Sequence, residues 1–109
     1  MDNVNIDKIL KDFKSHEEYL SEKLQDEKFQ KEFLRVSIEE YAEDGDFKEF
    51  FRSLEQVIKA RGSVRSFAEK IDIDRSNLCD ILNGKTIPRI DTLNKILKGL
   101  GASITIKTA

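Results

Sequence analysis

Residues 63–85 read SVRSFAEKIDIDRSNLCDILNGK, and this stretch is the most informative part of the chain. Ser63 and Asp74 each stand just before a short run of apolar residues at helical spacing, where a helix N-cap is expected. The two runs predict helices over 64–71 and 75–83, joined by a sharp turn. Two short helices in this arrangement are typical of a helix-turn-helix.

A helix-turn-helix needs a small residue where its second helix crosses the first, and apolar residues around that crossing point. Ala68 is the small residue here. The predicted core positions of the motif are Phe67, Ala68, Ile71, Ile73, Leu78 and Ile81. The polar residues between them are left facing outward, so the pattern that builds the core also builds a polar surface.

The second helix of such a motif enters the DNA major groove with its N-terminal residues against the base edges. Arginine suits guanine, asparagine suits adenine, and a carboxylate can accept a hydrogen bond from cytosine. The predicted base-reading residues are Arg75, Ser76, Asn77 and Asp80. The residues that flank them and are predicted to bind phosphates are Ser63, Arg65, Lys85 and Arg89.

Helical patterns also fill most of the remaining sequence. Asp26 and Gly45 predict the two ends of one helix, Asp46 and Gly62 those of the next, and apolar spacing predicts a last helix over 90–100. Two shorter helices are expected before them. The first carries Ile6, Ile9, Leu10 and Phe13, and the second starts at a capping box at Ser15–Glu18 and carries Tyr19, Leu20 and Leu24.

The helix over 26–44 has apolar residues on two nearly opposite sides, so it must be covered twice. One side carries Phe29, Phe33 and Val36, and the other carries Leu34, Ile38, Tyr41 and Ala42. One side is expected to pack on the following helices, and the other on the N-terminal helices, a second subunit or another protein. The candidate partner-binding residues are Tyr19, Leu20, Leu34, Ile38 and Tyr41.

The C-terminal residues 102–107 have a different pattern, with β-branched residues alternating at period two. This alternation predicts a short strand. A lone strand needs a partner, and a second copy of itself across a twofold axis is an economical one. Ile104 and Ile106 are therefore candidate dimer-strand residues.

The net charge of −2 is unevenly distributed along the 109 residues. Residues 1–61 carry 11 Lys and Arg against 16 Asp and Glu, whereas residues 62–109 carry 8 against 5. The acidic half and the basic half are thus expected to bind different partners, the basic half an anion and the acidic half a basic protein. No apolar run is long enough to cross a membrane, and the single cysteine fits a reducing compartment, so a cytoplasmic protein is expected.

The segment NGKTIP at 83–88, followed by Asp91-Thr92-Leu93 and Leu100-Gly101, resembles the Cro/phage-repressor (XRE) helix-turn-helix family over about residues 47–101. This resemblance implies an all-α fold. The implied architecture is a five-helix type of helix-turn-helix domain, placed at 46–101. An acidic N-terminal helical extension at 1–45 precedes this domain, and a short C-terminal β-strand or tail at 102–109 follows it. Two positions depart from the family pattern. Asp72 stands where the family has a left-handed glycine, and Arg89 replaces a small cap residue.

The resemblance extends upstream to Tyr19-Leu20, Asp26-Glu27-Lys28-Phe29, Phe33-Leu34, Ile38-Glu39-Glu40, Gly45-Asp46 and Ala60-Arg61-Gly62. These residues look like the addiction-module antidote proteins, which are HigA-like antitoxins. Members of that family act in bacteria, neutralise a RelE-like toxin that cleaves messenger RNA, and repress their own operon as dimers. The resemblance therefore implies operator DNA, a basic toxin and a second copy of the chain as partners.

Other readings of the sequence are a stand-alone transcriptional regulator and a pure protein-interaction module, the latter favoured by Asp72, Asp74 and Asp80 near the reading helix. An enzyme is disfavoured, because no activated nucleophile or phosphate-binding glycine motif is present. No cofactor or metal site is expected. The acidic residues between Glu39 and Asp46 lack the spacing of a calcium loop, His16 has no partner ligand, and Cys79 fits a half-buried small residue.

Overall fold

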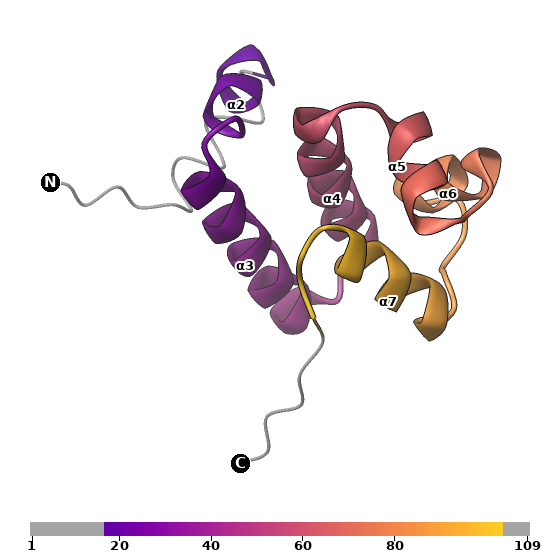
Figure 1. Cartoon of the computed structure of the whole chain (residues 1–109). Helices are drawn as coiled ribbons and strands as arrows, with labels where there is room; N and C mark the ends of the chain where they lie inside the picture. The colour runs from indigo at the N-terminus through magenta and orange to yellow at the C-terminus, as the bar shows by residue number, and fades with distance from the viewer. Residues whose placement is uncertain (1–16, 104–109) are drawn as a thin grey trace, which may run out of the picture.

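The computed structural model describes residues 17–103, and within that range all regular structure is helical (Figure 1). The helices are α2 (Glu17–Lys23), α3 (Glu27–Asp44), α4 (Phe47–Arg61), α5 (Val64–Ile71), α6 (Arg75–Leu82) and α7 (Ile90–Gly99). The helix expected at Ile6–Phe13, the capping box at Ser15–Glu18 and the strand expected around Ile104 and Ile106 lie outside the residues or side chains that are described. No strand occurs between residues 17 and 103.

The predicted ends of α3 and α4 are confirmed. The Asp26 carboxylate accepts hydrogen bonds from the backbone N–H groups of Lys28 and Phe29, and Gly45 ends α3 in the left-handed region at φ 67°. Asp46 then caps α4 by accepting from the backbone of Glu49. Side-chain caps satisfy the N–H groups that the first turn of a helix cannot pair internally. Because only Gly45 and Asp46 separate the two helices, α3 and α4 meet at a sharp corner.

The helical patterns predicted four helices between residues 46 and 101, and the structure has four there, α4 to α7. The fifth helix of the compact unit is α3, which packs along α4 and brings the Tyr41 ring onto the Phe50 ring at a centroid distance of 5.1 Å. Helix α6 ends at Leu82, with Asn83 as its C-cap, one residue earlier than predicted.

One hydrophobic core joins the N-terminal helices to α5 and α6. Its fully buried side chains come from α4, α6, α7 and the turn after α2. They are Leu24, Leu54, Val57, Ile58, Leu78, Ile81 and Ile96. Buried residues from both sides of residue 45 pack together in this core. The boundary at residue 45 therefore separates proposed roles, but it does not separate two hydrophobic cores.

Helix α3 is covered on both of its apolar sides over its N-terminal half only. Phe33, Leu34 and Val36 are buried, whereas Tyr41 remains 40% exposed and Ala42 lies at the surface. The last turns of α3 therefore present an uncovered face. No helix within residues 17–103 is long and apolar enough to cross a membrane.

Candidate functional site

Helix caps, one left-handed residue and a backbone hydrogen bond fix the turn between α5 and α6. Ser63 caps α5 in a capping box with Ser66, and Asp74 caps α6 by accepting a 3.1 Å hydrogen bond from the backbone N–H of Asn77. Asp72 takes the left-handed conformation at φ 58° and ψ 53°, which confirms the expectation for this position. The backbone N–H of Ile73 then donates to the Ala68 carbonyl at 3.0 Å and closes the turn.

The residues predicted to form the core of the motif lie inside it to different degrees. Phe67, Ala68, Leu78 and Ile81 are buried, and Ile71 and Ile73 are partly buried against the same core. Ala68 has only 2% of its surface exposed, as a residue at a helix crossing should.

Helix α7 approaches α5 closely at Gly99. A Cβ added to Gly99 would stand 2.5 Å from Cγ2 of Ile71 and 2.9 Å from Cζ of Phe67. The Lys70 ammonium donates to the Gly99 carbonyl at 2.9 Å, which holds the end of α7 against α5. Helix α7 therefore packs directly against α5 at this point.

The predicted base-reading residues occupy one end of α6. Arg75, Ser76 and Asn77 form its first turn and are exposed, whereas Asp80 is half-buried one turn later. Three consecutive donor or acceptor side chains at an exposed helix N-terminus can hydrogen-bond to base edges or to phosphates. Asp80 is less accessible than the other three, and Cys79 beside it is half-buried, as the sequence suggested.

The predicted phosphate-binding residues are all exposed, but two of them already make contacts. The Ser63 hydroxyl accepts a 3.0 Å hydrogen bond from the backbone of Ser66. Arg89 lies 3.4 Å from Asp91 in an exposed ion pair, and as the N-cap of α7 it makes no side-chain cap. The other two, Arg65 and Lys85, lie at the start of α5 and just after α6.

The acidic residues near this face have structural roles in the turn. Asp74 is used as the cap of α6, and Asp72 as the left-handed residue that ends α5. A carboxylate is favourable at the N-terminus of a helix, because the helix dipole is positive there. Their charges nevertheless remain beside Arg75 and reduce the positive potential of the face.

Two of the five candidate partner-binding residues are buried, which corrects their assignment to a surface. Leu20 and Leu34 are buried members of the hydrophobic core. Tyr19 is 49% exposed, Tyr41 is 40% exposed and Ile38 is half-buried, so these three remain accessible. The Lys23 ammonium lies 5.7 Å from the centroid of the Tyr19 ring.

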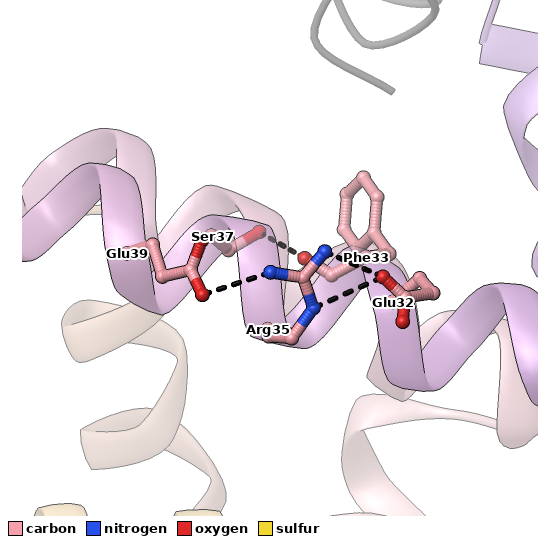
Figure 2. A network of polar contacts seen from close by, with 5 residues as sticks. All are labelled: Glu32, Phe33, Arg35, Ser37 and Glu39. Carbon is pink, nitrogen blue, oxygen red and sulfur yellow. Dashed lines mark hydrogen bonds and ion pairs between the residues drawn. The ribbon is translucent and has the colours of Figure 1, made fainter. Parts of the chain in front are cut away.

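The exposed surface of α3 carries a network of charges centred on Arg35 (Figure 2). The guanidinium contacts Glu32 at 2.6 Å and Glu39 at 2.8 Å. Its hydrogen bonds lower the pKa of Glu32 below the usual carboxyl value, and the two carboxylates raise the pKa of Arg35. Ser37 on the same helix donates from Oγ to the Phe33 carbonyl at 2.7 Å.

The acidic residues around the α3–α4 corner line a pocket of about 160 Å³ beside the Tyr41–Phe50 stack. Its carboxylates come from Glu40, Asp44, Asp46 and Glu49. Over residues 17–103, no group of three or more His, Cys, Asp or Glu side chains is arranged to hold a metal ion.

Sequence patterns did not reveal two features that connect distant segments. The buried Gln30 amide hydrogen-bonds to the Leu24 carbonyl and to Arg61, and a groove of about 680 Å³ separates α3 from the end of α7. Gln30 could have been suspected from its place between apolar residues on α3. The groove has no signal in the sequence, because its two walls are about 65 positions apart.

Comparison with known proteins bears on the role of these surfaces. A protein-family model described as "Probable addiction module antidote protein" matches residues 15–108, which is most of the chain. A search of curated proteins and a search of solved structures gave no match. An antidote is the antitoxin of a toxin–antitoxin pair, so the match also implies a cognate toxin as partner. The chain belongs to the addiction-module antidote protein family.

Proposed function

We propose that this chain is the HigA-like antitoxin of a type II toxin–antitoxin module. In this role it neutralises a RelE/HigB-like toxin that cleaves messenger RNA, and it represses its own operon as a homodimer. The observation that carries the proposal is the first turn of α6, Arg75 to Asn77, which is polar and exposed. This turn belongs to a pair of short helices arranged like a helix-turn-helix, in a chain of the antidote family.

DNA binding is supported by the separation of core-facing and exposed residues in α5 and α6. Leu78 and Ile81 face the core, which leaves Arg75, Ser76 and Asn77 on the outside. Arg65 and Lys85 are exposed on either side and can pair with phosphates. The XRE type of helix-turn-helix is proposed on this pattern and on the NGKTIP segment that follows α6.

Toxin binding is assigned to the N-terminal half. A protein that binds and cleaves RNA needs a basic surface, and residues 1–61 carry an excess of five acidic residues. Electrostatic complementarity of this kind speeds and directs association between proteins. Tyr19 and Tyr41 add accessible aromatic surface, which is typical of energetically important contacts.

This function consists of binding, without catalysis and without a cofactor, and places the chain in the bacterial cytoplasm beside its operon and toxin. The second candidate is a stand-alone XRE-type regulator with no toxin. The same α6 surface favours this candidate. In that case the N-terminal helices, with the exposed Tyr19 and Tyr41, would only stabilise the fold or form a dimer contact.

The test is co-expression with the product of the neighbouring reading frame, followed by a pull-down and a mobility shift on the upstream promoter DNA. We expect a stable complex that retards the DNA, with binding that weakens as salt rises. Arg75→Ala combined with Asn77→Ala should abolish retardation, whereas Lys28→Ala on α3 should not. A shift without a bound partner would establish the stand-alone regulator, and a partner without a shift would restrict function to toxin binding.

A further inference from the structure

A groove of about 680 Å³ runs between α3 and the segment that follows α7. Its apolar lining comes from Leu34 and Ile38 on α3, and from Leu100 and Ala102 on the other side. Ile38 and Ala102 are only partly buried within the chain, so apolar surface remains available in the groove.

The arginines in the walls already have partners within the chain. Arg35 is paired with Glu32 and Glu39, and the Nε group of Arg61 donates to Gln30. The other two charges, on Lys31 and Glu27, are of opposite sign. Glu32 and Glu39 neutralise Arg35, whereas Arg61 keeps its charge because the Gln30 amide is neutral. The apolar part of the groove, between Leu34, Ile38 and Ala102, suits a segment with apolar side chains.

The chain contains such a segment directly after the groove. Residues 104–106 read Ile-Thr-Ile, with an isoleucine on each side of Thr105, and the charged Lys107 follows at the end of this segment. If this segment is extended, Ile104 and Ile106 point to the same side and can enter one apolar groove together. Ala102, which lines the groove, is only two residues before Ile104.

The course of the backbone favours the groove of another copy over the groove of the same chain. A hydrogen bond of 2.8 Å from the Ala102 N–H to the Leu97 carbonyl, with Gly101 at φ 82°, turns the chain sharply after α7. In Figure 1, the segment that follows α7 runs toward the C-terminal end of α3. The residues of α3 that line the groove, from Glu27 to Ile38, belong to the earlier part of that helix.

We propose that residues 104–107 of one copy occupy the groove between α3 and the end of α7 of a second copy, and that the exchange is reciprocal. Reciprocal exchange fills both grooves with identical contacts, as a twofold interface requires. The proposal rests on the homodimer of the proposed function and names its contact. It replaces strand-to-strand pairing of Ile104 and Ile106 with insertion of both into an apolar groove.

The first test is disulfide cross-linking in a background in which the native cysteine is removed by Cys79→Ala. One full-length variant carries Ile38→Cys and a second, distinguished by a short affinity tag, carries Ile106→Cys. The mixed variants should form a cross-linked heterodimer on a non-reducing gel. Arg52→Cys, which is exposed on α4 and does not line the groove, replaces Ile38→Cys as the matched control and should give no such product.

The double variant with both Ile38→Cys and Ile106→Cys identifies the occupant. A disulfide within a single chain would show that the tail binds its own groove, and would overturn the proposal. A dimer by light scattering without the Ile38–Ile106 cross-link would also overturn it, while leaving the homodimer of the proposed function intact. A monomer by light scattering would overturn both.

A second measurement leaves the groove itself unchanged. Ile106→Asp should weaken dimerisation by about tenfold or more, because an apolar side chain is lost from a buried contact. Thr105→Asp adds the same charge on the opposite side of an extended segment and should weaken dimerisation much less. Equal dimer dissociation constants for the two variants would overturn the proposal.

Discussion

The Nε group of Arg61, the last residue of α4, donates a 2.9 Å hydrogen bond to Oε1 of Gln30 on α3. The Nε2 group of Gln30 in turn donates to the Leu24 carbonyl, so one buried amide connects the turn after α2 to the end of α4. Gln25 makes a parallel connection, from Nε2 to the Ala60 carbonyl at 3.1 Å. These hydrogen bonds thereby join the N-terminal helices to the end of α4.

The first prediction concerns this amide. Gln30→Met keeps the length of the side chain but removes both hydrogen bonds, and should lower the free energy of unfolding by about 1–3 kcal/mol. Arg61→Met should cost less, about 1 kcal/mol, because the bond to Leu24 remains. Urea unfolding measures both, with Lys28→Met, which is exposed and does not line the groove, as control. Equal losses for Gln30→Met and the control would show that the amide does not hold these segments together.

The second prediction concerns the close approach of α7 to α5. Gly99→Ala places a Cβ within 3 Å of Ile71 and Phe67, and should destabilise the fold by about 1–2 kcal/mol after the gain in helix propensity is counted. Lys98→Ala, an exposed change one residue away, should have little effect on thermal unfolding. Combining Gly99→Ala with Ile71→Ala should cost less than the sum of the two, because the clashing methyl group is gone.

Helix ends were predictable because each depends on one or two residues near in sequence. Asp26, Asp46, Ser63 and Asp74 all cap a helix as expected, since a short polar side chain reaches the free N–H groups of the first turn from the N-cap position. The left-handed conformation of Asp72 was instead expected from the family resemblance, because the family has a left-handed glycine at this position.

The accessible partner surface was less predictable, because it depends on which apolar side another segment covers. The helical pattern placed Leu34, Ile38 and Tyr41 on one side of α3, yet only Leu34 is buried. The groove beside Ala102 was unpredictable for the same reason, since it exists only after α7 has packed on α5.

The third prediction concerns pH and the Arg35 network. The folded-state pKa of Glu32 is lowered from 4.5, so its contribution to stability is present above that value and is lost as the pH falls through the lowered pKa. Glu32→Gln should therefore unfold more easily than the wild type at neutral pH, and the difference should vanish in strong acid. Chemical unfolding across the pH range measures it, with the exposed Glu69→Gln as control. A difference that grows in acid would contradict the ion-pair origin of the shift.

The fourth prediction separates the conformation of Asp72 from its charge. Asp72→Gly relieves the left-handed strain at φ 58° and should raise the free energy of unfolding by about 0.5–1 kcal/mol, since the greater freedom of glycine in the unfolded chain offsets part of the gain. Asp72→Asn keeps the side-chain shape, so it should change stability less while removing the same charge. Both variants should bind promoter DNA more tightly at low salt, because a carboxylate next to the reading helix repels phosphates. Mobility shifts at two salt concentrations measure the DNA affinity of both variants. If only Asp72→Gly bound DNA more tightly, the geometry of the turn, and not the charge of Asp72, would limit recognition.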